Sequence, residues 1–276
     1  MGWCKSASPF MKRRYLCHYR LSFVNGTAKP GWMKGTMKVW WLHIIHLLLA
    51  PLYFIALPQG LWLKKHALRM PEAEGPRKMS LGHTQSSRLK LLYLGESPAA
   101  GVGIESINDA VSARVARNLT EVSQIDFQLL AQNGITLKEL LLKLQRTQTH
   151  APDISIINMG VNDCTNLTSC TQWQIHIHGL VQELKTRGSK HIFFTAVPPL
   201  QQFPLLPAPL SWLMGHRANI LNTLLENICR QHHIQFLPFS AQLTPQLICI
   251  DGYHPNEKGA ELWANSITRQ IIPIIK

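Results

Sequence analysis

The stretch Leu91–Gly103, which reads LLYLGESPAAGVG, decides the fold. Its first four residues are apolar and predict a buried strand that stops at Gly95. Ser97 follows two residues later, and small residues lead from it into a helical pattern that begins near Glu105. Ligands in open parallel sheets bind beyond the carboxyl ends of the strands, where a turn of this kind can carry a nucleophile or a phosphate site. A phosphate loop has less support, because neither G-x-x-x-x-G-K-[ST] nor G-x-G-x-x-G occurs here.

Strands and helices are expected to alternate from this stretch to the C-terminus. The expected strands are 90–94, 125–131, 154–158, 191–197 and 234–237, and the expected helices are 106–119, 136–145, 171–186, 211–231 and 256–272. Thr136 and Glu139 form a capping box at the start of their helix. The expected strands carry apolar residues on both sides, as strands covered on both faces do, so the pattern predicts an α/β domain with a parallel sheet between helices.

The net charge of +13 is concentrated in the N-terminal quarter of the chain. Residues 1–71 hold 11 Lys and Arg and no Asp or Glu, whereas residues 72–276 carry 17 basic and 15 acidic groups. The main domain therefore lacks the clustered basic face of nucleic-acid-binding proteins, and no nucleic acid is expected as a partner. A basic segment beside an apolar one is typical of membrane-flanking sequence.

Residues 39–63 contain no Asp, Glu, Lys or Arg over 25 positions. A helix of that length is long enough to cross a hydrocarbon core of roughly 30 Å. Pro51 and Pro58 indicate that the helix is kinked or only half inserted. A buried soluble helix fits poorly because the run is apolar on all sides, so we expect a membrane anchor.

The chain is thus expected to have four parts. They are a basic extension at 1–38, a membrane anchor at 39–63, a polar linker at 64–87 and a folded domain at 88–276. Met37 lies directly before the apolar segment, and we expect it to be the natural start of the protein.

Chemically useful residues follow several of the expected strands. Their blocks are Gly95-Glu96-Ser97, Asn133-Gly134, Gly160-Val161-Asn162-Asp163 and Asp251-Gly252-Tyr253-His254-Pro255. The carboxyl ends of parallel strands lie on one edge of a sheet, so a hydroxyl, an imidazole, a carboxylate and an amide are gathered around one crevice. These are the groups that acyl transfer requires.

The chemistry suggests a role for each group. Ser97 would attack a carbonyl carbon, His254 would take its proton, and Asp251 would hold the other imidazole nitrogen. The backbone N–H groups of Ser97 and Gly134 and the side chain of Asn162 would stabilise the oxyanion. Asp163 is expected to be structural and to bond backbone near its own block.

On these four blocks the sequence resembles the SGNH (GDSL-type) hydrolase superfamily, which is named for its catalytic Ser, Gly, Asn and His. The resemblance covers roughly residues 88–276 and implies a three-layer α/β/α sandwich with a flavodoxin-like parallel sheet. It also implies ester hydrolysis without a metal or other cofactor. With the N-terminal anchor it suggests a membrane-tethered bacterial branch at the inner membrane, with the side of the catalytic domain left open. The family usually has Asp where this chain has Glu96, and the longer side chain could shift the turn that presents Ser97.

The loop 197–215, VPPLQQFPLLPAPLSWLMG, is unusually apolar and borders the same crevice. Leu205, Leu206 and Trp212 are candidate substrate-binding residues that could line an acyl pocket or lean on the membrane. A loop that only packs on its own domain is the equal alternative.

We therefore expect a membrane-anchored serine esterase that acts on lipid-derived or small acyl esters. Two alternatives stay open: an O-acetylesterase or acyltransferase of cell-envelope glycans, and an inactive domain that binds acyl ligands or a protein partner. Cys164 and Cys170 could be inert thiols or one disulfide.

Overall fold

The computed structural model describes residues 30–82, 87–240 and 243–276, and its centre is a six-stranded sheet. The strand order is β1-β3-β2-β4-β5-β6, and only the β1–β3 pair is antiparallel. The strands are β1 (Lys78–Leu81), β2 (Arg88–Gly95), β3 (Gln124–Ala131), β4 (Ile154–Asn158), β5 (His191–Thr195) and β6 (Gln235–Leu237). The five parallel strands follow the flavodoxin-like order, which confirms the expected fold class.

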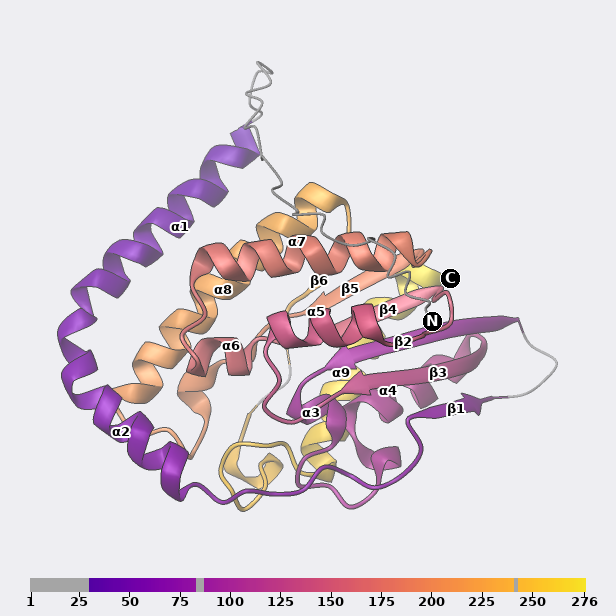
Figure 1. The fold of residues 1–276 in the computed structure, drawn as a ribbon, viewed down its shortest axis with the longest axis horizontal. Helices are drawn as coiled ribbons and strands as arrows, with labels where there is room; N and C mark the ends of the chain where they lie inside the picture. The colour runs from indigo at the N-terminus through magenta and orange to yellow at the C-terminus, as the bar shows by residue number, and fades with distance from the viewer. Residues whose placement is uncertain (1–29, 83–86, 241–242) are drawn as a thin grey trace, which may run out of the picture.

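Helices cover both faces of the sheet, as Figure 1 shows. They are α3 (Ser97–Ala100), α4 (Val111–Asn118), α5 (Leu137–Arg146), α6 (Val161–Thr165), α7 (Cys170–Thr186), α8 (Leu210–His232) and α9 (Glu257–Ile275). Alternate side chains of β2 enter the two layers: Leu91 and Tyr93 pack with α4 and α9, whereas Leu92 and Leu94 pack with α5, α7 and α8. This alternation explains why the strand is apolar at successive positions.

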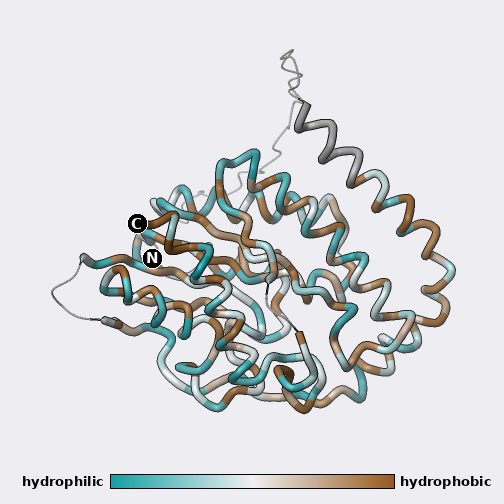
Figure 2. Tube along the Cα trace, turned by 180° about the vertical axis from the view of Figure 1, so that it is seen from behind, coloured by the Kyte–Doolittle hydropathy of each residue, from teal (hydrophilic) through white to brown (hydrophobic). Residues whose placement is uncertain are grey.

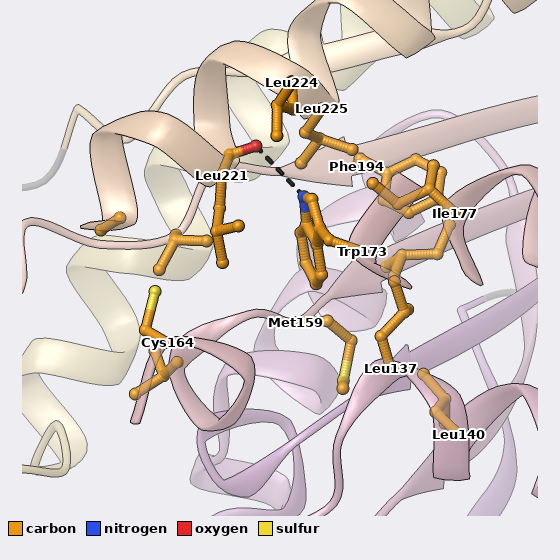
Figure 3. Close-up of a cluster of buried hydrophobic side chains, with 14 of the residues drawn as sticks. Leu137, Leu140, Met159, Cys164, Trp173, Ile177, Phe194, Leu221, Leu224 and Leu225 are labelled. Carbon is orange, nitrogen blue, oxygen red and sulfur yellow. Dashed lines mark hydrogen bonds between the residues drawn. The ribbon is translucent and has the colours of Figure 1, made fainter. Parts of the chain in front are cut away.

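Trp173 on α7 is the largest side chain that is fully buried in the layer of α5, α7 and α8. Figure 3 shows its ring between Met159, Ile177 and Leu221. Its indole N–H donates to the backbone carbonyl of Leu221 at 3.2 Å, so the polar edge of the ring is satisfied. The ring therefore joins α7 and α8 beneath the loop that follows β4.

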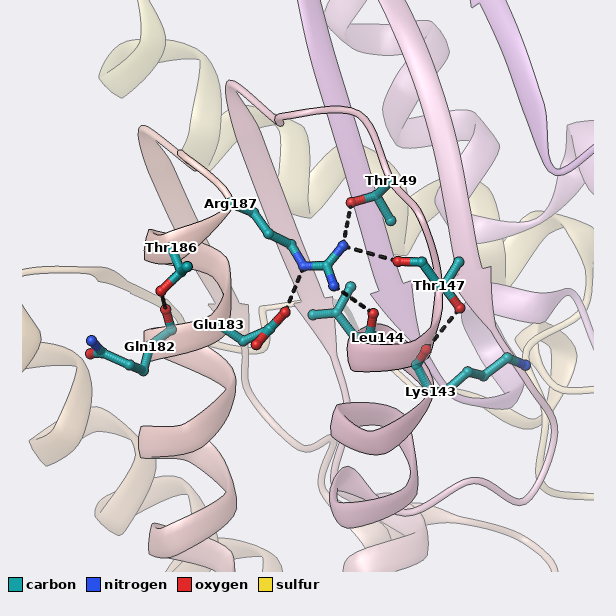
Figure 4. Close-up of polar contacts among 8 residues, drawn as sticks. All are labelled: Lys143, Leu144, Thr147, Thr149, Gln182, Glu183, Thr186 and Arg187. Carbon is teal, nitrogen blue, oxygen red and sulfur yellow. Dashed lines mark hydrogen bonds and ion pairs between the residues drawn. The ribbon is translucent and has the colours of Figure 1, made fainter. Parts of the chain in front are cut away.

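Arg187 joins the ends of α7 and α5, as Figure 4 shows. Its guanidinium donates to the Leu144 carbonyl at 2.7 Å, to the Thr147 carbonyl at 3.0 Å and to Thr149 Oγ1 at 2.9 Å. It also pairs with Glu183 at 2.8 Å. Carbonyls at a helix C-terminus lack intrahelical partners, so this cation satisfies the end of α5.

Two N-terminal helices, α1 (Pro30–Leu48) and α2 (Tyr53–His66), pack against α8 on the outside of the domain (Figure 1). Figure 2 shows how much of their length is hydrophobic. In the described parts of the chain no single helix is both long and apolar enough to cross a membrane. The segments Val39–Leu48 and Ala50–His66, bent by 50° at their junction, reach that length and composition only as a pair.

Strand β1 lies inside the segment 64–87 that the sequence suggests is a linker. It pairs with β3 from Lys78↔Gln128 to Leu81↔Ile125, and Glu74 bridges to Ser106. The sequence does not reveal this strand because it is four residues long and only partly buried. Most of the expected basic extension, including Cys4 and Cys17, lies outside the described residues.

The other expected elements are found with small shifts at their ends, apart from the helix expected at 106–119. Ser106 accepts from the Asn108 backbone N–H and opens a short 3₁₀ turn, so α4 begins only at Val111. The capping box at Thr136 and Glu139 is confirmed.

Candidate active site

The carboxyl ends of β2, β3 and β4 lie side by side, as the parallel sheet requires. Gly95 is in register with Ala131 of β3 and with Asn158 of β4. The loops that follow these three residues carry the first three sequence blocks, which therefore meet at one edge of the sheet.

Ser97 begins the short helix α3, directly beyond the end of β2. The turn is held by the Glu96 backbone N–H, which donates to the Asn158 carbonyl at 3.1 Å, and by the Glu96 carbonyl, which accepts from Ala99 and Ala100. Ser97 itself is 5% exposed. Its hydroxyl is thus placed on a tightly bonded turn at the sheet edge.

The Glu96 side chain connects the first and third blocks. Its carboxyl oxygens accept from the backbone N–H of Val161 at 2.8 Å and of Asn162 at 3.0 Å. It also accepts from the Asn162 side-chain amide at 2.7 Å. Burial raises the pKa of Glu96 to about 8, against the opposing effect of these N–H donors. The extra methylene relative to Asp is therefore used to reach the third block.

The amide nitrogen of Asn162 has two partners in this structure. Besides Glu96, it donates to the backbone carbonyl of Ile135 at 3.1 Å, the longer of its two hydrogen bonds. Ile135 directly follows Gly134, so this bond brings the second and third blocks together. Gly160, two residues before Asn162, has φ +126°, and a Cβ there would collide with the side chain of Val197, so glycine is required.

Gly134 has φ +76°, and a Cβ built on it would meet no atom within 4 Å, so its backbone borders open space. The neighbouring Asn133 N–H donates to the Glu72 carboxylate at 2.6 Å, and Glu72 also pairs with Arg77 at 2.9 Å. The position of the Gly134 loop is thus fixed by residues from the expected linker.

Asp251 and His254 form a close pair. The imidazole Nδ1 lies 2.6 Å from Asp251 Oδ2, and Oδ1 of the same carboxylate accepts from the backbone N–H groups of Tyr253 and His254. Burial would raise the pKa of Asp251, but these hydrogen bonds outweigh it and hold the pKa below its ordinary value. The carboxylate occupies Nδ1, which leaves Nε2 as the nitrogen available for proton transfer.

One contact links the turn of Asp251 and His254 to the serine side of the edge. Cys249 Sγ lies 3.6 Å from the carbonyl of Gly103, just beyond α3. Burial raises the pKa of Tyr253, and the carboxyls of Glu96 and Asp251 add to the effect. No hydrogen bond joins Ser97 to His254 among the residues that the structure describes.

The three candidate substrate-binding residues differ in their surroundings. The Leu205 N–H donates to the Gly252 carbonyl at 3.0 Å, so its loop touches the turn that holds His254. Leu206 packs partly against the core, and Trp212 is 58% exposed on α8. The three side chains therefore do not share one environment.

Asp163 was expected to bond backbone near its own block, but its side chain instead connects the third block to the start of α5. It accepts from the Leu137 N–H at 2.9 Å and from the Thr168 hydroxyl at 2.9 Å. Cys164 and Cys170 are both free thiols in the structure. Among the described residues no group of three or more His, Cys, Asp or Glu side chains could hold a metal ion.

Sequence reasoning missed the roles of Glu96 and Glu72. In the sequence Glu96 only replaces the Asp that is usual in the family. Its hydrogen bonds to Asn162 join two loops that are far apart in the chain, so no local pattern predicts them. Glu72 is far from Asn133 in sequence, and no local motif connects them.

A serine at the end of a parallel strand and a buried carboxylate–imidazole pair on a flavodoxin-like sheet define a class of α/β hydrolytic enzymes. Residues 93–262 match the GDSL-like lipase/acylhydrolase family, and the chain belongs to that family. It is an ester-hydrolysing enzyme.

Solved structures share this fold at low sequence identity. A lipase/acylhydrolase from Enterococcus faecalis is 18% identical with a TM-score of 0.55, and the match covers 67% of this chain and 96% of that one. For the Clostridium thermocellum family 3 carbohydrate esterase the identity is 18%, the TM-score 0.55 and the coverage 68% and 97%. Axe2, an acetyl xylan esterase from Geobacillus stearothermophilus, is 19% identical with a TM-score of 0.51. That match covers 69% of this chain and 96% of the Axe2 chain. A comparison with curated protein sequences gives no match.

Proposed function

We propose that this protein is a membrane-associated serine esterase that uses Ser97 as nucleophile, His254 as general base and Asp251 as the group that orients the imidazole. The observation that carries the proposal is the 2.6 Å contact between His254 Nδ1 and Asp251. It holds the imidazole in the tautomer whose Nε2 lone pair can accept a proton.

The reaction begins when Ser97 Oγ attacks the ester carbonyl and its proton passes to His254 Nε2. The tetrahedral intermediate collapses, the C–O bond to the alcohol breaks, and the imidazolium gives its proton to the leaving oxygen. Water then attacks the acyl-serine, with His254 again taking a proton. The carboxylic acid leaves, and the proton returns to Ser97.

The oxyanion is stabilised by the backbone N–H groups of Ser97 and Gly134 and by the Asn162 amide. The open space at Gly134 supports its part in this role. For this role the Asn162 amide gives up its 3.1 Å hydrogen bond to Ile135 and turns as a unit towards the oxyanion, which also alters its bond to Glu96.

A membrane location is part of the proposal, with residues 39–63 as the attachment. The bent apolar helix pair supports it by length and composition. Long-chain or small acyl esters are the proposed substrates. O-acetylated envelope glycans are a second candidate, favoured by the fold similarity to an acetyl xylan esterase and a carbohydrate esterase.

The test is hydrolysis of p-nitrophenyl esters from acetyl to palmitoyl by the detergent-solubilised full chain. Ser97→Ala should lower the rate by about 10³-fold or more. Ser80→Ala, which removes an exposed hydroxyl on β1, should leave it unchanged. A folded wild-type protein that neither turns over these esters nor reacts with a fluorophosphonate would contradict the proposal and favour an inactive ligand-binding domain.

The chain-length profile separates the two substrate classes. A preference for long acyl chains supports lipid-derived esters, whereas activity confined to acetyl esters supports the glycan alternative. Transfer of the acyl group to an added sugar would identify an acyltransferase.

A further inference from the structure

The helices α1 and α2 present a broad apolar surface to the outside of the molecule. Seven large hydrophobic side chains on them are more than 60% exposed: Trp40, Trp41, Leu47, Leu48, Phe54, Leu61 and Trp62. An exposed patch of this kind is typical of a surface that contacts lipid or another protein. We call these seven residues the outer face of the helix pair.

The opposite face of the helix pair is fixed to the hydrolase domain. The Gln59 amide donates to the Ala208 carbonyl at 2.9 Å, and Gln59 Oε1 accepts from the Leu210 N–H at 3.3 Å. His216 Nε2 lies 2.8 Å from the Leu42 carbonyl, and Ala56 is 1% exposed. A helix that crosses a bilayer is surrounded by lipid and does not pack along its soluble domain. These contacts instead hold α1 and α2 along the side of α8.

The charge of the sequence that contains the helix pair fits an anionic surface. The first 71 residues carry 11 Lys and Arg and no Asp or Glu. Lys64, Lys65 and Arg69 lie exposed at and just beyond the end of α2. Lysine and arginine side chains that flank an apolar segment lie at the level of the headgroups and are attracted by anionic lipids. This charge favours a bilayer with anionic headgroups over a second copy of the same basic chain.

The domain-facing side of the helix pair is connected to the catalytic edge through the loop that precedes α8. This loop bonds to Gln59 at one end and, through the Leu205 N–H, to Gly252 at the other. The ring of Phe203 in this loop packs edge-on against the ring of Tyr253, with 5.1 Å between the ring centroids. Ile250, next to the proposed triad carboxylate, is 88% exposed. The helix pair is thus connected through a single loop to the turn that carries His254.

We propose that α1 and α2 lie within one leaflet of an anionic bilayer instead of crossing it, and that they hold the catalytic edge at the lipid surface. The substrate part of this inference rests on the proposed esterase function. Under it, the enzyme acts on ester lipids of the leaflet in which its helices are buried.

Membrane binding is measured by flotation of the full chain with vesicles of phosphatidylcholine, with and without phosphatidylglycerol. Ser97→Ala is introduced in every sample so that the lipid stays intact. The triple variant Phe54→Ser, Leu61→Ser, Trp62→Ser should lower vesicle affinity by about a hundredfold or more, because three apolar contacts with lipid are lost. A matched triple on the hydrolase domain, Leu142→Ser, Ile175→Ser, Leu262→Ser, also replaces exposed apolar residues and should bind as the parent does.

Whether the helices cross the membrane is tested in cells with a tag at each end of the full chain. Both tags should be accessible to protease from the same side of the membrane. Tags on opposite sides would overturn the one-leaflet arrangement. If the parent protein does not bind vesicles but dimerises through the outer face, the proposal that this face contacts a bilayer is overturned.

The link to catalysis is tested with Ser97 restored. The outer-face triple should hydrolyse soluble esters as fast as the wild type but be slower on ester lipid in vesicles. Flotation does not depend on turnover. If the wild-type protein hydrolyses no ester, the esterase function is rejected, but the flotation result still shows whether the outer face binds the bilayer. Equal rates of both proteins on vesicles would reject the coupling.

Discussion

Replacing Glu96 with Gln tests how the first and third blocks are held together. The carboxyl accepts three N–H groups, two on one oxygen and one, from Val161, on the other. Gln keeps one acceptor oxygen but places an NH₂ group opposite a donor. The buried Val161 N–H then loses its partner at a site where residue 96 is 1% exposed.

An unpaired buried donor costs about 1–3 kcal/mol of the free energy of unfolding. For a domain of this size, each kcal/mol lowers the melting temperature by about 2–4 °C. The reaction with a fluorophosphonate should also slow, because the Asn162 backbone and amide are no longer fixed. Glu261→Gln changes an exposed glutamate on α9 and should alter neither measurement.

The pH dependence gives the sharper part of the test. The pKa of Glu96 is raised from 4.5 to about 8 in the folded protein. Between these values the unfolded chain binds fewer protons at this residue than the folded one, so its contribution to stability falls as the pH rises. The stability advantage of the wild type over Glu96→Gln should be largest near pH 5 and shrink towards pH 8.

Urea denaturation at several pH values measures this difference directly. An advantage that grows with pH would refute the reasoning, because it would mean that the N–H donors outweigh burial and keep the carboxylate ionised. A loss of stability below about 0.5 kcal/mol at every pH would refute the structural role itself.

Three further predictions concern the proposed triad and the core. Asp251→Asn should lower the ester hydrolysis rate by about 10⁴-fold, as expected when the tautomer of a triad histidine is no longer fixed. Because the pKa of Asp251 lies below its ordinary value, its contribution to stability is present near neutral pH and is lost on acidification below about pH 4, so acid unfolding of the variant should be less steep. Trp173→Ala should cost about 3–5 kcal/mol in urea denaturation, with a smaller loss contradicting its place in the core. Arg187→Ala should cost about 1–3 kcal/mol without changing the turnover of soluble esters, and reduced turnover would show that the far end of α5 influences the site.

The parallel core could be predicted from the sequence because its physics is local. Leu91–Leu94 is apolar at every position, and its alternate side chains enter both layers of the core, which a strand covered on both faces explains. The pairing of Asp251 with His254 was also predictable, since three residues separate them and a turn can bring the side chains together.

Other features depend on contacts between distant segments and leave no local pattern. The short strand β1 exists because β3 offers it an edge, and its own sequence, KMSL, indicates little. The apolar run 39–63 predicts contact with lipid but cannot reveal that Gln59 and Leu42 attach the helices to α8. The bond between Glu96 and Asn162 likewise requires the register of β2 and β4.

The hydrogen bond that the Asn133 N–H donates to Glu72 has a practical consequence for how far this enzyme can be truncated. A fragment that starts at Arg88 would keep every motif of the hydrolase, yet it would lose both β1 and the carboxylate that fixes the loop of Gly134. Such a truncation would leave the β3 edge of the sheet bare and ready to pair with another chain. The shortest fragment that retains a complete catalytic edge therefore begins before Glu72, close to the end of α2.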